Sequence, residues 1–278
     1  MPPIRTRKRL SAEKSRKTIY GRNITRLHIG ARERVFTVHE DVLCASSKFF
    51  REKVQPNRKE IEGDCSICHE VMVIHSKELT FCTSCGGNFH HECIEDWHVQ
   101  SPRRCPLCRS TWTQAPREQT LEFPAFEEST FGIYYEWIYH NVIPYSPNDI
   151  DFEGYLGFIE AYLFGLHISD ISFCQVILGA MLEMFKDLEI FPDVDVIQAA
   201  YGDDPPFIST GVQRLRRFLV KTYIACGDYD WIELTEKDEI PYEFLKDFAV
   251  AMIEKHPGND EWDLETVWKE AIDEAPAA

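Results

Sequence analysis

Cysteine and histidine recur in closely spaced pairs over one short part of the chain, residues 65–108. Seven of the ten cysteines of the 278-residue chain lie there. The pairs are Cys65 and Cys68, Cys82 and Cys85, His90 and Cys93, and Cys105 and Cys108. Two residues separate the members of each pair, so that both side chains can reach one ion from a tight turn. Structural zinc takes four sulfur or nitrogen ligands and leaves no open position. The spacing therefore predicts two structural zinc ions.

The eighth ligand is the least certain from spacing, because two histidines are adjacent. His90 precedes Cys93 with the same two-residue separation as in the C-x-x-C pairs, whereas His91 leaves only one residue between. His90 is therefore predicted to be the ligand, with His91 as the alternative. The remaining cysteines lie in apolar helical contexts and are expected to be small buried hydrophobes. These are Cys44, Cys174 and Cys226.

The composition favours a reducing environment, where clustered cysteines bind metal rather than form disulfides. The amino-terminal residues 1–23 are basic and lack the apolar core of a secretory signal. No stretch approaches the roughly 20 apolar residues that cross a membrane. An intracellular location, in the cytoplasm, the nucleus or both, is the resulting expectation.

Charge is divided unevenly along the chain. Residues 1–26 hold nine Lys or Arg and one Glu, whereas the whole chain carries −16, which leaves −24 for the remainder. The strongly negative charge of the residues after 26 argues against a broad nucleic-acid-binding face. The basic residues at the start fit either a nuclear import signal or a solvated, disordered tail. They are Arg5, Arg7, Lys8 and Arg9.

The order of the ligand pairs resembles that of a RING finger. In that family the first and third pairs share one zinc ion, and the second and fourth pairs share the other. The resemblance implies a first site of Cys65, Cys68, His90 and Cys93 and a second site of Cys82, Cys85, Cys105 and Cys108. Gly87 is a departure, because common RING patterns place a histidine there. The second site therefore depends on Cys82 and Cys85 serving together.

Residues beside the ligands favour a RING over a PHD finger, a histone-tail reader with the same ligand order. A PHD finger normally has a tryptophan two residues before its seventh ligand, where this chain has Arg103. In RING ubiquitin ligases, apolar residues form a groove for the ubiquitin-conjugating enzyme. The matching residues here are Ile67, Trp97, Pro106 and Leu107. Arg109 matches an arginine that contacts both that enzyme and ubiquitin. The plainer interpretation, packing of a small zinc-held core, explains the apolar residues but not the arginine.

The segments on either side of the cluster must position it. ITRLHIG and RVFTVH predict a hairpin, and EDVLCASSKFFREKV predicts a helix after it. Beyond the cluster, TLEFPAF predicts a third strand, and apolar helical patterns follow. The two flanking halves resemble the BTB/POZ fold, as in many fungal BTB proteins, through the pattern F-x-V-H-x-x-x-L-x-x-x-S-x-F-F. The matching residues are Phe36, Val38, His39, Leu43, Ser47, Phe49 and Phe50. His39 has no nucleophile beside it and is expected to be structural.

The predicted fold class is α+β. It comprises a BTB/POZ-like domain, made of a small sheet plus helices, that is interrupted by a zinc-bound RING cross-brace module and followed by a helical carboxyl-terminal region. The predicted parts are a basic disordered tail (1–23), the first BTB part (24–56), the inserted RING-type zinc finger (57–117), the second BTB part (118–190) and the helical region with an acidic tail (191–278).

These resemblances imply a RING-type E3 ubiquitin transferase that has no covalent catalytic residue. It would bind a ubiquitin-conjugating enzyme and promote transfer of ubiquitin to a lysine of an unknown protein substrate, with Arg109 as a non-covalent linchpin. The BTB part would mediate homodimerisation or partner recruitment; a cullin is compatible with it but not implied. The alternative is a non-enzymatic BTB adaptor with a protein-binding zinc finger. Ile67, Trp97 and Arg109 together favour the ligase.

Overall fold

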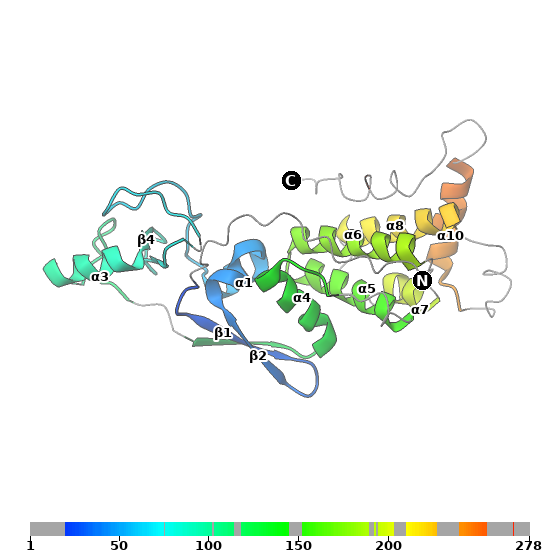
Figure 1. The fold of residues 1–278 in the computed structure, drawn as a ribbon, viewed down its shortest axis with the longest axis horizontal. Coiled ribbons are helices and arrows are strands. Elements are labelled where there is room, and N and C mark those ends of the chain that lie inside the picture. The colour runs from blue at the N-terminus through cyan, green and yellow to red at the C-terminus, as the bar shows by residue number, and fades with distance from the viewer. Residues whose placement is uncertain are drawn as a thin grey trace, which may run out of the picture.

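The computed structural model describes residues 20–74, 76–101, 103–113, 118–144, 152–188, 192, 194–202, 210–226, 239–254 and 269. Figure 1 shows three regions in a row. The zinc-ligand segment lies at one end, a small sheet with α1 and α4 lies next to it, and a group of longer helices forms the other end. The fold is a mixture of helices and small sheets, as predicted.

A three-stranded sheet joins the two sides of the zinc-ligand segment. Strand β1 (Ile24–Ile29) pairs antiparallel with β2 (Arg34–His39) and parallel with β5 (Glu118–Phe123), in the order β2-β1-β5. The register places Ile24 beside Glu118. The chain therefore leaves the domain after β2 and its two short helices, forms the zinc-ligand segment, and returns as the neighbour of its first strand.

The helix predicted after the hairpin is two helices, α1 (Glu40–Ser46) and α2 (Lys48–Val54). They are separated at Ser47, whose backbone is extended (φ −86°, ψ 118°). The Ser47 hydroxyl accepts a hydrogen bond from the Phe50 N–H (3.1 Å) and donates one to the Ile168 carbonyl (2.5 Å). Serine favours this N-cap position because its side chain satisfies a free N–H of the first turn. The prediction of one continuous helix was wrong at this residue.

Strand β5 also ends earlier than predicted. The sequence pattern extended the strand to Phe126, but pairing stops at Phe123, immediately before Pro124. Proline has no N–H to give to a ladder and is confined to strand ends and edges. The strand that was predicted after the zinc-ligand segment is therefore present, but shorter.

Helices fill the rest of the described chain. They are α4 (Glu128–His140), α5 (Phe152–His167), α6 (Ile171–Leu188), α7 (Val194–Tyr201), α8 (Thr210–Cys226) and α10 (Tyr242–Glu254). Their buried side chains join those of the sheet in one continuous apolar core, from Leu27 on β1 to Phe164 on α5 and Phe244 on α10. Within the described ranges, no helix combines the length and apolar character that a membrane crossing requires.

A buried carboxylate ties α1 to the longer helices. Asp170 is fully buried and accepts hydrogen bonds from the Ser46 hydroxyl, the Tyr134 hydroxyl (3.2 Å) and the Phe173 N–H (3.0 Å). Burial raises the pKa of Tyr134 well above its ordinary value, so this hydroxyl stays protonated and can donate. Three elements, α1, α4 and the start of α6, therefore meet at one side chain.

His39 is structural, as expected. Its backbone N–H donates to the Tyr139 hydroxyl (3.0 Å), and its Nδ1 lies 2.7 Å from the same oxygen. The Tyr139 oxygen accepts a hydrogen bond from the His39 backbone N–H, so the Tyr139 hydroxyl can donate its own proton to His39 Nδ1. Tyr20 stacks on the His39 ring at 4.9 Å, so the described chain begins within the predicted tail and already packs there. Residues 1–19, with the basic cluster, lie outside the described residues.

Two of the three isolated cysteines behave as predicted. Cys44 and Cys174 are buried in the main core, and burial raises the pKa of Cys44 to about 12. A thiol that stays protonated in an apolar surrounding is inert. The side chain of Cys226 and most of the acidic carboxyl-terminal tail lie outside the described residues.

Candidate metal centre

The zinc-ligand segment is built on three turns of the same design. In each, the first cysteine of a C-x-x-C pair accepts, through its carbonyl, a hydrogen bond from the N–H four residues later. The bonds are His69 N to Cys65 O (2.8 Å), Gly86 N to Cys82 O (2.7 Å) and Arg109 N to Cys105 O (3.0 Å). The donor residue has a positive φ in every turn, 60°, 73° and 63° in that order. This left-handed residue closes the turn and brings the two sulfurs to one side.

The fourth pair is placed by secondary structure rather than by such a turn. Strand β4 (Asn88–His90) pairs antiparallel with β3 (Leu79–Phe81) and leads directly into helix α3 (His91–Gln100). His90 is the last residue of the strand, and Cys93 lies in the first turn of the helix. The strand end and the helix start therefore aim both side chains at the same point.

These elements bring the eight predicted ligands together as two groups of four. The first group is Cys65, Cys68, His90 and Cys93, and the second is Cys82, Cys85, Cys105 and Cys108. Within each group the ligand atoms all lie within 4.8 Å of one another. The pairing of first with third and second with fourth is the cross-brace expected from the RING resemblance.

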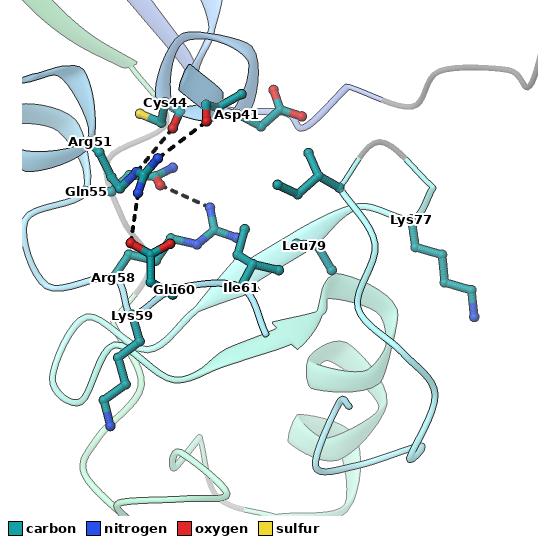
Figure 2. Close-up of a pocket in the computed structure, with 12 residues that line it drawn as sticks. Asp41, Cys44, Arg51, Gln55, Arg58, Lys59, Glu60, Ile61, Lys77 and Leu79 are labelled. Atoms are coloured by element: carbon teal, nitrogen blue, oxygen red, sulfur yellow. Dashed lines mark hydrogen bonds and ion pairs between the residues drawn. The ribbon is translucent and has the colours of Figure 1, made fainter. Parts of the chain in front are cut away.

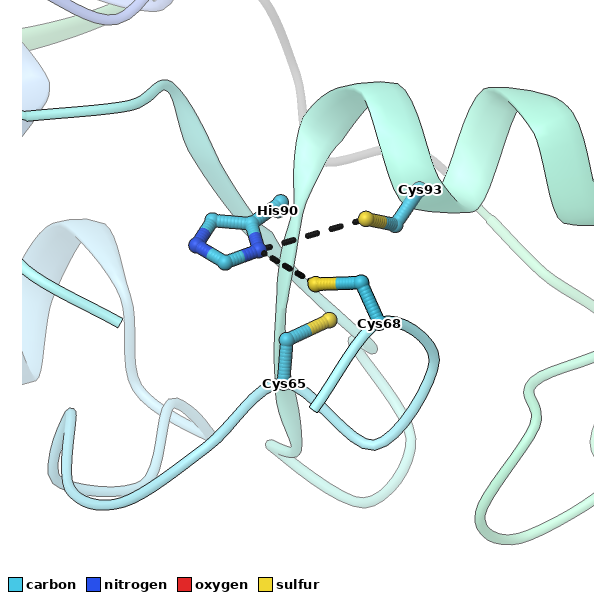
Figure 3. A group of neighbouring side chains, drawn as sticks. All are labelled: Cys65, Cys68, His90 and Cys93. Atoms are coloured by element: carbon cyan, nitrogen blue, oxygen red, sulfur yellow. Dashed lines mark hydrogen bonds between the residues drawn. The ribbon is translucent and has the colours of Figure 1, made fainter. Parts of the chain in front are cut away.

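His90, and not His91, lies in the first group. Its Nδ1 is 3.3 Å from Cys68 Sγ and 3.9 Å from Cys93 Sγ, and Figure 3 shows the imidazole facing the sulfurs of all three cysteines. His91 is the first residue of α3 and turns instead to Glu95, with Nε2 3.0 Å from the carboxylate. The alternative that the sequence left open is thereby decided in favour of His90.

The distances in the second group fit a tetrahedral zinc ion. Cys82 Sγ lies 3.8 Å from Cys108 Sγ, and Cys85 Sγ lies 3.8 Å from Cys105 Sγ. Zinc–sulfur bonds of about 2.3 Å at tetrahedral angles require sulfurs about 3.8 Å apart. A disulfide would need a separation of about 2.05 Å. The residues present therefore fit two structural zinc ions, one for each group.

The surroundings shift the pKa values of two thiols of the second group in opposite directions. The Ser110 hydroxyl, 2.9 Å from Cys108 Sγ, lowers the pKa of Cys108 to about 6, whereas burial raises the pKa of Cys105 to about 12. A coordinating thiol is deprotonated outright by a divalent metal ion, because the metal charge outweighs the cost of burial. Zinc bound here would hold both sulfurs as thiolates.

A small apolar core connects the two ligand groups. Phe89 is fully buried between them, and its ring packs edge-on against Trp112, with 5.8 Å between centroids. Ile94 on α3 and Met72 complete this core, with Cys65, Cys82 and Cys105 at its margin. A core of so few apolar residues is too small to stabilise a folded domain by itself. The zinc ions therefore supply much of the folding free energy of the segment.

The residues predicted to bind a conjugating enzyme divide into exposed and partly buried ones. Leu107 is 54% exposed and Trp97 is 37% exposed. These large apolar side chains therefore do not add fully to the small core of the module. The Trp97 indole N–H is fixed by a 3.1 Å hydrogen bond to the Arg104 carbonyl. Ile67 and Pro106 are partly buried, and Ile67 packs against the small core. Leu107 and Trp97 are therefore accessible to solvent at the surface of the module.

Arg109 is exposed and occupies the left-handed position that closes the third turn. Its φ of 63° is a conformation that residues other than glycine rarely adopt. Sequence reasoning had assigned a partner-facing role to Arg109 but missed this backbone constraint. The only signal in the chain was Gly86, which stands at the equivalent place in the second turn.

Gly87, the departure from the common RING pattern, has a packing reason. A Cβ at this position would lie 2.5 Å from Leu107 Cδ1 and 3.5 Å from Cys85 Sγ. A larger residue would displace Leu107 from the surface of the second site. With Cys82 and Cys85 both in the second group, no histidine is needed at position 87.

Comparison with known proteins agrees with the geometry of this segment. Residues 63–109 match the family model described as Ring finger domain. No curated protein and no solved structure matches the chain. Residues 63–109 therefore form a RING-type zinc finger whose two ligand groups fit its two structural zinc ions. The match covers this module only, and the BTB/POZ likeness of the flanking halves stays a prediction.

Proposed function

We propose that the protein is a RING-type ubiquitin ligase. The observation that carries the proposal is a zinc module with Trp97 and Leu107 held at its surface beside an exposed Arg109. RING fingers commonly bind ubiquitin-conjugating enzymes, and exposed apolar side chains together with an exposed arginine suit that role. An adaptor that used the zinc finger only to bind a protein would need the apolar residues but not the arginine.

The mechanism depends on orientation rather than on a covalent step. The zinc ions would hold the fold, and a RING finger forms no covalent intermediate with ubiquitin. Ile67, Trp97, Pro106 and Leu107 would bind the conjugating enzyme. Arg109 would then donate charge-assisted hydrogen bonds to carbonyls of the enzyme and of its attached ubiquitin. Holding a tethered ubiquitin near its attack geometry raises the rate at which a lysine amine attacks the thioester carbonyl and displaces the cysteine thiolate of the conjugating enzyme.

The remainder of the chain would supply the partner. We propose that the sheet and the helices around it form a BTB/POZ-like domain that self-associates or recruits the protein substrate. The support is the sequence pattern around His39 and the element order, in which a hairpin, two short helices, a third strand and a helical run share one core. The proposed place of action is a reducing intracellular compartment, the cytoplasm or the nucleus.

The test is single-turnover discharge of a ubiquitin-loaded conjugating enzyme to free lysine, using the zinc-loaded full chain and a broad panel of enzymes. Ile67→Ala should lose both enzyme binding and discharge. Arg109→Ala should keep the zinc, the fold and most of the binding, yet slow discharge by about 10-fold or more, because its bonds form in the oriented state. Arg109→Lys should recover only part of the rate, because an ammonium lacks the planar fork.

The control is Arg104→Ala, which removes an exposed arginine side chain of the same module and keeps the backbone carbonyl that accepts from the Trp97 indole. This variant should discharge ubiquitin at the wild-type rate. Failure of the wild-type chain to accelerate discharge with every enzyme of the panel would favour the adaptor.

A further inference from the structure

The connection between α2 and the zinc module is a structured contact rather than a loose linker. Gln55 ends α2 with an N–H bond to the Arg51 carbonyl (2.9 Å), and the Arg58 N–H returns to the Gln55 carbonyl (2.9 Å). One residue later, the Lys59 N–H donates to the Gly86 carbonyl of the second zinc turn (3.0 Å). The chain is therefore bonded to the module within five residues of the helix end.

Gly86 permits this close approach. A Cβ at Gly86 would lie 1.9 Å from the Asn57 carbonyl oxygen and 3.0 Å from the Lys59 nitrogen. The Asn57 side chain also donates to the Thr83 carbonyl (3.1 Å). The second zinc turn and the connection thus lie backbone against backbone, a contact that only glycine allows.

Arg58 joins the helices to the module by its side chain. Its Nε donates to Asn88 Oδ1 on β4 (2.7 Å), and its NH1 donates to Gln55 Oε1 at the end of α2 (3.1 Å). The guanidinium also lies 5.1 Å from the centre of the Phe81 ring on β3. A planar guanidinium can span two acceptors and cover an aromatic face at once, which an ammonium cannot.

The network continues on both sides of Arg58. Gln55 Nε2 donates to Glu40 Oε1 on α1 (2.6 Å), and Asn88 Nδ2 donates to the Lys59 and Glu60 carbonyls (3.0 and 3.1 Å). Glu40, Gln55 and Asn88 are all buried. Burial raises the pKa of Glu40 and lowers that of Arg58. Buried groups of this kind are costly unless their partners are fixed, so the network is sensitive to the relative placement of α1, α2 and the module.

The cleft at this junction does not itself indicate a ligand. It measures about 150 Å³ and is bordered by α1, α2 and the start of the module (Figure 2). Two of its charged side chains, Arg51 and Glu60, lie 2.8 Å apart, and a third, Lys77, is paired with Glu70 within the module. Arg22 and Glu78 (3.1 Å) add a further ion pair across the junction. The Arg51–Glu60 and Arg22–Glu78 pairs therefore join the two parts.

We propose that Arg58 is a positioning residue, which fixes the direction in which the RING module presents its enzyme-binding face relative to the rest of the protein. The presentation of an enzyme-binding face rests on the proposed ligase activity. The fixed orientation of the zinc module relative to the helices does not depend on that activity. Zinc holds the module folded and the large core holds the helices folded, so neither part needs Arg58 for its own fold. What the network adds is one defined arrangement of the two.

The direct test is a distance measurement by pulsed electron resonance on the zinc-loaded full chain. Because cysteines serve as ligands, the spin labels are attached to encoded ketone amino acids at two exposed positions, Val99 on α3 (86% exposed) and Val35 on β2 (47% exposed). The wild-type background should give one narrow distance distribution. Arg58→Gln should broaden it while two zinc ions remain bound, and Arg58→Lys should have a smaller effect.

Two further variants keep the test decisive. Lys59→Gln removes a neighbouring charge whose side chain is exposed and whose hydrogen bonds to Gly86 and Asn88 use only the backbone, so the distribution should stay narrow. Asn88→Ser removes the partner of Arg58 on the module and should broaden the distribution as Arg58→Gln does; it replaces that variant if Arg58→Gln does not fold. A broad distribution in the wild-type background, or a narrow one in both network variants, would overturn the proposal.

A second measurement connects orientation to activity and separates the two proposals. Discharge to free lysine should stay within about twofold of wild type in Arg58→Gln, because the described contacts of Arg58 involve none of the residues assigned to the enzyme-binding face. The set of lysines on the chain that receive ubiquitin should change, because the module no longer points in one direction. A wild-type chain inactive with every enzyme would defeat the ligase, and the label distances would still decide the role of Arg58.

Discussion

At the scale of single residues, the sequence predicted ligand identity well because zinc coordination is a local property. A C-x-x-C pair needs only a tight turn, and three such pairs together with the His90–Cys93 pair define eight ligands without knowledge of the fold. The left-handed backbone at His69 and Arg109 was not predictable in the same way. A positive φ at residues other than glycine leaves no mark in composition, and it is fixed by the hydrogen bond that closes each turn.

A first prediction concerns the ligands themselves. Cys82→Ser should remove one of the two zinc ions, because a serine hydroxyl cannot replace a thiolate in a four-ligand site. Cys174→Ser should leave the zinc content at two, because Cys174 lies in the main core far from both groups. Native mass spectrometry of the purified proteins gives the zinc count directly. A wild-type protein with a single zinc ion would contradict the two-site assignment.

At the scale of elements, the sequence identified the hairpin, the third strand and the long apolar helices, because each has a clear periodicity. It missed the break at Ser47 and the early end of β5. In each case a single residue ends an element although the apolar pattern continues. Ser47 caps a new helix, and Pro124 has no N–H for strand pairing. Helix α7 was also missed, since eight residues give too short a pattern to stand out.

A second prediction concerns that break. Ser47→Ala should lower the free energy of unfolding by about 1–3 kcal/mol, because it removes the cap of α2 and one of the two donors to the Ile168 carbonyl, leaving only the Phe49 N–H (3.3 Å). Urea unfolding followed by circular dichroism measures the loss. Thr37→Ala, on the exposed side of β2, should cost at most about 0.5 kcal/mol. Equal losses in the two variants would show that the Ser47 bonds are not stabilising.

At the scale of the whole molecule, the α+β character and the position of the zinc segment within the chain could be predicted, because hydrophobic patterns resume after it. The contacts between the two parts could not. Arg58, Asn88 and Gly86 look ordinary in the sequence, and their roles depend on surfaces that meet only after both parts have folded. The domain boundaries and the BTB/POZ likeness remain predictions.

A third prediction follows from the two ends of the insert. Gln119 at the start of β5 donates to the Val54 carbonyl at the end of α2 (3.0 Å), so the chain leaves and returns at nearly the same place. Replacing residues 57–117 by a short Gly/Ser linker should therefore leave a folded remainder. Circular dichroism and a cooperative thermal transition provide the readout. A molten remainder would show that the flanking halves depend on the zinc module for their fold.

A fourth prediction uses the same variant as a control. Chelation of zinc should unfold the module. It should also lower the free energy of unfolding of the helical remainder by about 2 kcal/mol, because pairing β1 with β5 then costs the closure entropy of a long flexible loop. Helical ellipticity during urea unfolding, with and without a strong chelator, measures this effect. The variant with the Gly/Ser linker should be indifferent to the chelator. A remainder equally stable with and without zinc would contradict the coupling.

The parallel pairing of β1 with β5 also has a consequence for synthesis on the ribosome. Strand β1 emerges early, but its neighbour is made only after the whole zinc module, and until then one edge of β1 carries unpaired N–H and C=O groups. Such an edge can pair with other nascent chains. Zinc supply during translation sets how compact the intervening segment is when β5 appears. In a zinc-starved cell, newly made chains would therefore keep the edge of β1 unpaired for longer. They would aggregate before the mature, folded protein lost its zinc.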